Sequence, residues 1–275
     1  MHKPVTSVVP HAFRQAAPGL RGVDLFARDH PIDPFLVVTE FHMDRAVFGP
    51  HPHAGITVLT YLLPESTGAF INRDSLGDRS VIEPGGVHAT QAGRGVHHDE
   101  VPRTPGVDCH GFQIWINHRE EDRFVEPASF HASAAEVPVV QHGGAAVRVV
   151  QGRFGGQRAP FEGVTPVALL DVSLERGARL TLEAGAMAFL YGTAGDDLRC
   201  GEHTFGAQAL VLFDDSGDEV VVEAGRSGGR VLFASGTPLR EPVAYGGPFV
   251  MTTPAQLAEA RRLYAAGQMG TLAGP

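Results

Sequence analysis

The stretch His51-Pro52-His53, followed 45 residues later by His98-Asp99-Glu100, is the most informative part of this sequence. Each tripeptide carries two metal-capable side chains at positions i and i+2. On a β-strand such residues point to the same face, so two facing strands would direct three imidazoles and one carboxylate at a single point. The pattern predicts a metal site inside a β-structure, with the ligands His51, His53, His98 and Glu100.

Three imidazoles and one carboxylate suit Fe²⁺, and another divalent transition metal such as manganese, nickel or copper is possible. Four protein ligands are fewer than the six that such ions accept. Water, O₂ or a substrate could therefore fill the remaining positions. The alternative interpretation of the same residues is an ordinary polar barrel mouth.

The overall composition is that of a folded protein. Hydrophobic residues make up 43% and charged residues 19% of the 275 residues, and the formal charge is −9. No basic stripe predicts direct nucleic-acid binding, and no apolar run predicts a membrane span. The start of the sequence lacks the apolar segment of a secretory signal, and two distant cysteines do not indicate a disulfide framework. We expect a soluble cytoplasmic protein.

Short apolar runs separated by 34 glycines and 20 prolines predict an all-β protein. Residues 147–239 repeat the pattern of short strands and glycine turns found in residues 35–117. We therefore expect two tandem β-barrels or sandwiches, in domains 1–138 and 139–275. The Ala-, Pro- and Glu-rich stretch at residues 125–142 is interpreted as their connection. The repeat in the second half contains a single histidine, His203, so only the first is equipped for metal. The expected strands cover residues 34–43, 57–63, 80–82, 111–117, 146–150, 168–174, 187–192, 210–213, 219–223 and 231–235.

One helix is predicted near the end of the sequence. Thr253 is a good N-cap, Pro254 fits the first helical position, and Gln256 completes a capping box. Gly267 can end the helix.

A substrate pocket beside the metal is predicted from residues close to it in sequence. Phe48, Phe112 and Trp115 could together form a dry pocket for a flat aromatic ligand, although core packing is the simpler role for each. His88 could line the same cavity as a substrate contact or as an outer partner of the metal ligands.

Several motifs resemble the pirin family. They are Gly49–Gly55, Thr60–Leu63, Arg73–Gly77, Glu83–Val87, Ala92–Glu100, Gly111–Asn117, Pro238–Val243 and Gly247–Met251. The resemblance implies two tandem cupin (double-stranded β-helix, or jelly-roll) barrels followed by a short C-terminal helix. It implies one iron in the first barrel, on the same four ligands, and a second barrel without metal. Ala54, Ile56 and Thr57 depart from the Arg, Phe and Glu that pirins usually carry, which leaves the substrate open.

Three functions follow from these observations. The first, which the resemblance to quercetin-cleaving pirins supports, is a metal-dependent dioxygenase that acts with O₂ on a flavonol such as quercetin or a related phenolic. In that reaction Glu100 would be the catalytic base. The second is a non-enzymatic regulator that binds a protein partner according to its iron or redox state. The third is a cupin whose metal only stabilises the barrel.

Overall fold

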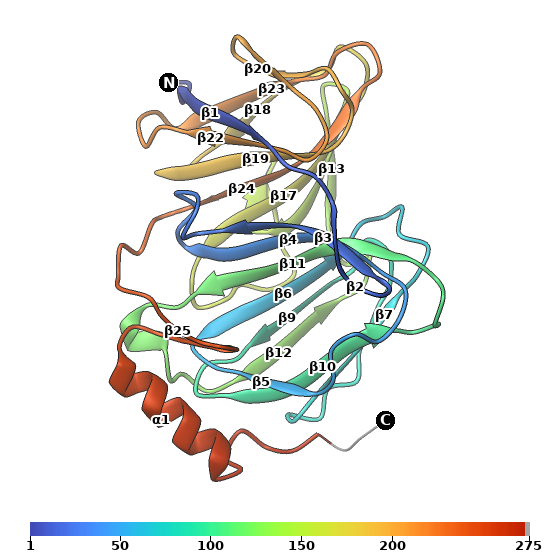
Figure 1. The fold of residues 1–275 in the computed structure, drawn as a ribbon. Helices are drawn as coiled ribbons and strands as arrows, with labels where there is room; N and C mark the ends of the chain where they lie inside the picture. Colours follow the sequence, from blue (N-terminus) through green and yellow to red (C-terminus); the bar gives the residue numbers. More distant parts are fainter. Residues whose placement is uncertain (273–275) are drawn as a thin grey trace.

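The N-terminal half forms a barrel from a seven-stranded sheet that faces a four-stranded sheet (Figure 1). This computed structural model describes residues 1–272. In spatial order the large sheet contains β12 (Ala128–Ala132), β9 (Val87–Gln91), β6 (Ile56–Leu62), β11 (Cys109–Asn117), β4 (Phe35–Met43), β3 (Leu20–Phe26) and β2 (Arg14–Ala17). The small sheet contains β5 (His51–His53), β10 (Val96–Pro102), β7 (Phe70–Asp74) and β8 (Val81–Ile82).

The C-terminal half repeats this arrangement. Its large sheet contains β1 (Val5–Pro10), β22 (Ala209–Phe213), β19 (Met187–Ala194), β24 (Gly229–Gly236), β17 (Val167–Leu174), β14 (Ala145–Gln151) and β13 (Val139–His142). Its small sheet contains β18 (Arg179–Glu183), β23 (Glu219–Glu223), β20 (Leu198–Cys200) and β21 (His203–Phe205). The remaining elements are the hairpins β15 (Arg153–Phe154) with β16 (Gln157–Arg158) and β25 (Ala244–Gly246) with β26 (Phe249–Met251), the 3₁₀ turn η1 (Glu120–Asp122) and helix α1 (Pro254–Ala265).

The two large sheets place their strands in equivalent order and pack against each other. The core between the barrels combines Phe35 and Phe112 of the first half with Phe189, Leu210 and other buried apolar residues of the second. The expected all-β architecture of two tandem jelly-roll units with a C-terminal helix is confirmed. Helix α1 begins with the capping box that Thr253 and Gln256 predict. No helix within residues 1–272 is long and apolar enough to cross a membrane.

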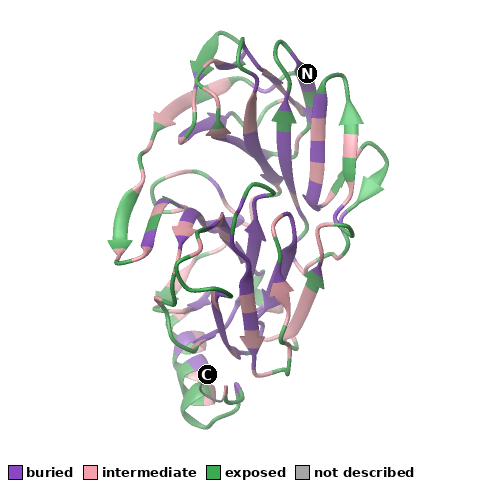
Figure 2. Cartoon of the chain, turned by 90° about the vertical axis from the view of Figure 1, so that its right-hand side faces the viewer, coloured by how far each residue is buried: buried purple, intermediate pink, exposed green. Residues whose placement is uncertain are grey.

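The interiors of the two barrels differ. In the C-terminal barrel the small-sheet strands β18 and β23 bury Leu180, Leu182, Val220 and Val222 in a continuous apolar core. The equivalent strands of the N-terminal barrel, β5 and β10, carry the histidines and Glu100 instead. Both barrels bury their inward-facing strands (Figure 2), but aliphatic side chains fill the second barrel, whereas the first keeps polar groups inside.

Both ends of the chain cross to the opposite barrel. Strand β1 pairs with β22, so residues 5–10 belong to the C-terminal sheet although they begin the chain (Figure 1). The C-terminal hairpin lies beside β5, where Ala54 and Phe249 form a parallel bridge. The buried Arg123 guanidinium fixes this contact by donating hydrogen bonds to the carbonyls of Gly55 (2.8 Å) and Val250 (3.3 Å). The domain boundary at residue 138 stays a prediction. Because strand β1 and the C-terminal hairpin each contact the opposite barrel, a single boundary does not separate all contacts of the two halves.

A buried polar triad joins the barrels at Tyr61 of β6. The Tyr61 hydroxyl donates to Asp171 of β17, and the same carboxylate accepts hydrogen bonds from the Arg230 guanidinium of β24. The Asp171 side chain is 3% exposed and that of Arg230 is 12% exposed. This charge pair is thus held almost entirely away from water.

A second triad has the same arrangement, but its tyrosine comes from the C-terminal barrel and its carboxylate from the N-terminal barrel. Tyr191 of β19 donates to Glu40 of β4 (2.8 Å), and Nε2 of His110 on β11 lies 2.9 Å from the same carboxylate. Each barrel therefore provides a tyrosine to the carboxylate of the other. The first half places a histidine where the second half places an arginine.

The interpretation of residues 125–142 as a connection is wrong in part. The segment contains β12 and β13, which form one outer edge of each large sheet. These edge strands are half-exposed, so they lack the apolar alternation by which buried strands are found in a sequence. The N-terminal strands β1, β2 and β3 were also not expected from the sequence, for the same reason in β1 and β2.

Candidate metal centre

Strands β5 and β10 bring three histidines together. In the antiparallel register His98 lies opposite His51 and Val96 lies opposite His53. The ring centroids are 4.8 Å apart for His51 and His53, and 4.9 Å apart for His98 and each of the other two. One ring nitrogen of each residue lies within 4.8 Å of those of the other two. The i and i+2 spacing thus produces the convergence expected of strand residues.

Backbone carbonyls orient two of the three rings. Nδ1 of His51 lies 2.9 Å from the carbonyl oxygen of Gly49, and Nδ1 of His53 lies 3.2 Å from that of Pro248. A carbonyl oxygen only accepts, so each Nδ1 carries the proton and each Nε2 is left with a free lone pair. This arrangement fixes the ring and the tautomer that metal-ligating histidines use.

His98 gives the most direct indication of a missing partner. Its side chain is 1% exposed, and neither ring nitrogen has a hydrogen-bond partner among the described residues. Buried polar atoms of this kind are normally satisfied, by protein, water or an ion. A metal bound between the three rings would satisfy His98.

The buried rings of His53 and His98 favour the uncharged form that binds metal. Burial, together with the nearby His51, lowers the pKa of His53 to about 3. Burial also lowers the pKa of His98 well below its usual range, and the neighbouring His53 and His51 add to this effect. Neutral imidazoles with free lone pairs are metal ligands, so this group could hold a divalent metal ion.

Glu100 is two residues beyond His98 on β10 and lines the same cavity. It is not part of the group whose ligand atoms lie within 4.8 Å of one another. Its Oε2 accepts hydrogen bonds from Thr60 Oγ1 (2.7 Å) and Gln113 Nε2 (3.3 Å). Burial raises the pKa of Glu100 to about 7, although the hydrogen bonds from Thr60 and Gln113 act to lower it. A bound cation would oppose that rise.

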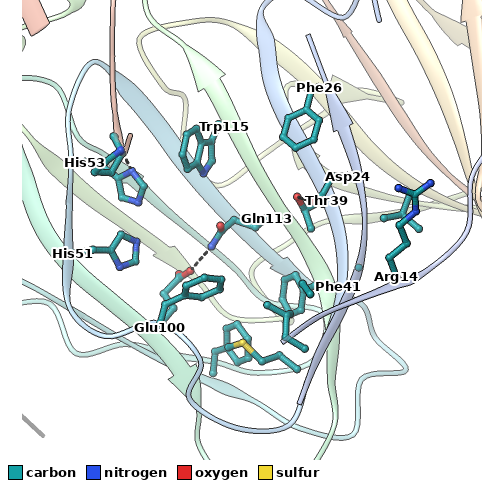
Figure 3. Close-up of a pocket in the computed structure, with 18 of the residues that line it drawn as sticks. Arg14, Asp24, Phe26, Thr39, Phe41, His51, His53, Glu100, Gln113 and Trp115 are labelled. Atoms are coloured by element: carbon teal, nitrogen blue, oxygen red, sulfur yellow. Dashed lines mark hydrogen bonds between the residues drawn. The ribbon is translucent and has the colours of Figure 1, made fainter. Parts of the chain in front are cut away.

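The three histidines and Glu100 form one wall of a cavity of about 800 Å³ (Figure 3). Trp115 packs edge-on against His53, with ring centroids 5.2 Å apart. Apolar walls come from Phe26, Phe41 and Phe48, and a polar group away from the histidines contains Asp24 and Thr39. This volume is in the range of pockets that hold drug-sized molecules.

Comparison with known proteins matches both halves of the chain to pirin family models. The model of the Pirin family matches residues 11–116, and that of the Pirin C-terminal cupin domain matches residues 169–270. A pirin-like protein from Solanum lycopersicum is 32% identical over 251 residues, which cover 87% of this chain and 82% of that protein. The chain belongs to the pirin family.

Solved structures share the pirin bicupin fold. A quercetin 2,3-dioxygenase from Acinetobacter baumannii matches with a TM-score of 0.87 at 22% identity, over 99% of this chain and all of that chain. The bacterial pirin YhhW from Escherichia coli, in complex with nickel(II), matches with a TM-score of 0.65 at 18% identity, over 84% of this chain and all of that chain. At these identities the likeness concerns the fold.

The structure places two of the four expected pocket residues in the cavity of this pirin. Phe48, 56% exposed, and Trp115 line it. Phe112 and His88 do not, which corrects the expectation for both. The side chain of Phe112 points to the opposite face of β11 from those of Gln113 and Trp115. It therefore packs in the core between the barrels, with its ring centroid 5.9 Å from that of Tyr191.

Two contributors to the site of this pirin were not predicted from the sequence. Pro248 provides the carbonyl that orients His53 from 195 residues away. Gln113 holds Glu100 from the large sheet on the other side of the barrel. Gln113 alternates with Phe112 next to Trp115, so strand periodicity could have indicated that it faces inward.

Proposed function

We propose that this pirin is a metal-dependent dioxygenase that acts with O₂ on a flavonol such as quercetin or a related phenolic, with Fe²⁺ as the metal. The single observation that carries the proposal is the convergence of three imidazoles, two of them oriented by backbone carbonyls, on the wall of an aromatic-lined cavity. Structural metal sites are usually closed by protein ligands, whereas catalytic sites keep a position open toward substrate.

His51, His53 and His98 would hold the metal, and Glu100, which lines the same cavity two residues beyond His98, would be the fourth ligand. When bound, a divalent metal supplies Lewis acidity that lowers the pKa of a phenolic hydroxyl placed against it. Fe²⁺ fits this ligand set, as do other first-row ions. The nickel(II) in the bacterial pirin YhhW supports a divalent transition metal without deciding which one.

The cavity provides the surfaces that a flat phenolic needs. The rings of Trp115 and Phe48 lie 5.2 Å from His53 and 6.4 Å from His51, respectively. Phe26 and Phe41 line the cavity further from the histidines (Figure 3). Aromatic walls favour stacking or edge-on contact with an aromatic substrate. Asp24 and Thr39 can hydrogen-bond to hydroxyl groups on the ring that lies away from the metal.

Glu100 is placed to take the proton of the substrate hydroxyl. Thr60 and Gln113 both donate to Oε2, and no donor from residues 1–272 reaches Oε1. The free oxygen can therefore accept a proton while Oε2 is held in position. The carboxylate would then act as a general base beside the three histidines.

An O₂-uptake assay tests the proposal. Iron-loaded protein mixed with quercetin should consume O₂ and bleach the flavonol absorbance. Glu100→Gln should lower kcat by about 10²- to 10⁴-fold, the usual contribution of a general base. Glu83→Gln is the matched control, because that carboxylate is half-exposed and pairs with Arg103 outside the cavity.

Metal content measured on the same samples separates two roles of Glu100. Full occupancy with lost turnover would support the base, whereas lost occupancy would make Glu100 a ligand. Fully loaded protein that turns over no flavonol or catechol would sink the dioxygenase proposal. The regulator hypothesis would then be the better one.

A further inference from the structure

A second group of metal-capable side chains lies inside the N-terminal barrel, apart from the three-histidine site. Asp74, Asp78 and His88 each place one ligand atom within 4.8 Å of those of the other two. Asp74 ends β7, Asp78 follows the turn after it, and His88 comes from β9 on the facing sheet. The group therefore brings together both sheets of the barrel.

The turn between the two aspartates is tightly built. Oδ1 of Asp74 accepts hydrogen bonds from the backbone N–H groups of Leu76 (2.8 Å) and Asp78 (3.0 Å). Gly77 adopts a φ of +97°, which permits the chain to return to Asp78. Oδ1 of Asp78 accepts from Asn72 Nδ2 (2.8 Å) and the Ser80 N–H (2.9 Å), so local hydrogen bonds fix both carboxylates.

Each carboxylate keeps one oxygen with a single donor. In the part of the chain that the structure describes, Oδ2 of Asp74 accepts only from Ser129, and Oδ2 of Asp78 accepts only from the Ser80 hydroxyl (2.7 Å). An ionised carboxylate offers about four acceptor positions, two on each oxygen. An acceptor position is therefore open on both residues.

His88 is the independent sign of a missing ligand. It is fully buried, its Nε2 lies 3.3 Å from Thr90 Oγ1, and its Nδ1 has no partner among the described residues. Burial lowers the pKa of His88 to about 4, so the ring is neutral at neutral pH. An uncharged ring with an unused nitrogen next to two carboxylates is a metal-ligand environment.

The negative charge of the group has no counter-charge. No lysine or arginine within residues 1–272 forms an ion pair with Asp74 or Asp78, and the nearby Arg73 is paired with Asp99. Asp74 is only 4% exposed. Buried carboxylates are normally paired with a cation or coordinate a metal.

This group does not serve the three-histidine site as an orienting partner. Asp74 lies opposite His98 in the β7–β10 register, which makes a hydrogen bond between them the obvious alternative role. Within residues 1–272, however, neither ring nitrogen of His98 has a hydrogen-bond partner. The open acceptors of Asp74, Asp78 and His88 therefore need another explanation.

We propose that Asp74, Asp78 and His88 bind a second divalent cation, with Zn²⁺ or Mn²⁺ as the chemical class. One imidazole and two carboxylates suit these ions, and Ca²⁺ and Mg²⁺ prefer oxygen ligands alone. The ion would link the turn after β7 to β9 and hold the small sheet against the large sheet. The proposal does not depend on the dioxygenase reaction.

Zinc titration of metal-free protein tests the second site. Calorimetry, with metal analysis after dialysis, should give two equivalents of Zn²⁺ per chain for the wild type and one for His88→Gln. His53→Ala should also retain one equivalent, and the combination of both changes should retain none. The matched control is His131→Gln, which removes an exposed ring 6.0 Å from His88 and should keep two equivalents.

Asp78→Asn keeps the proposal falsifiable if His88→Gln fails to fold. It preserves the side-chain volume, and binding of the first equivalent together with circular dichroism reports on folding. One equivalent in the wild type would overturn the second site and leave the three-histidine site intact. Two equivalents retained in both His88→Gln and Asp78→Asn would overturn it as well.

Discussion

His98→Ala is expected to lower the affinity of the three-histidine site for Fe²⁺ by more than about 100-fold and to abolish flavonol turnover. Loss of a partner that only orients a metal ligand already costs 10- to 100-fold in affinity, and His98 would be a direct ligand. Its ring nitrogens have no hydrogen-bond partner among residues 1–272, and its ring centroid lies 4.9 Å from those of His51 and His53. Equilibrium dialysis with iron analysis, followed by the O₂-uptake assay, measures both effects.

His97→Ala is the matched control for this prediction. His97 precedes His98 on β10, so its side chain points to the opposite face, where its ring lies 5.9 Å from Tyr264. Iron affinity and turnover should stay within about 2- to 3-fold of the wild type, the ordinary spread of such measurements. Equal loss of iron in both variants would contradict the assignment of the ligands.

Arg230→Met is expected to lower the free energy of unfolding by about 3–5 kcal/mol, the usual effect of removing one partner of a buried ion pair. The change leaves Asp171 between the two barrels with only the Tyr61 hydroxyl as a close partner. Desolvation of an unpaired carboxylate then opposes folding. Urea denaturation followed by tryptophan fluorescence and circular dichroism measures the loss.

A surface pair on the same barrel provides the comparison. Arg179 lies 3.3 Å from Glu223, and the two side chains are 61% and 40% exposed. Solvent screens such a pair, so Arg179→Met should change the free energy of unfolding by less than about 1 kcal/mol. Equal effects of the two changes would show that the inter-barrel triad does not stabilise the protein.

The three-histidine group was predictable because its information is local. Two i, i+2 pairs on strands determine which side chains share a face, and β5 and β10 are neighbours in one sheet, so the two pairs meet on the same side of it. The helix after Thr253 was predictable for the same reason, since a capping box is contained within four residues. The role of Glu100 was less predictable, because its orientation depends on hydrogen bonds from Thr60 and Gln113 of the facing sheet.

The elements that the sequence did not indicate depend on distant partners. Strands β12 and β13 are ordered by pairing at sheet edges, which leaves little trace in hydrophobic periodicity. Phe112 illustrates a different cause: its sequence neighbours line the cavity, but the alternation of strand side chains turns it into the core between the barrels. His88 was expected near the substrate, and only the facing sheets show that it joins Asp74 and Asp78 instead.

The carbonyl of Pro248 has a consequence for how the protein is made. Synthesis proceeds from the N-terminus, so all three histidines emerge from the ribosome long before the residue that orients His53. The bridge between Ala54 and Phe249 likewise cannot form until Phe249 has been synthesised. A metal ion that meets the nascent chain would find His53 without its orienting carbonyl, so we expect tight binding only after Pro248 has been synthesised.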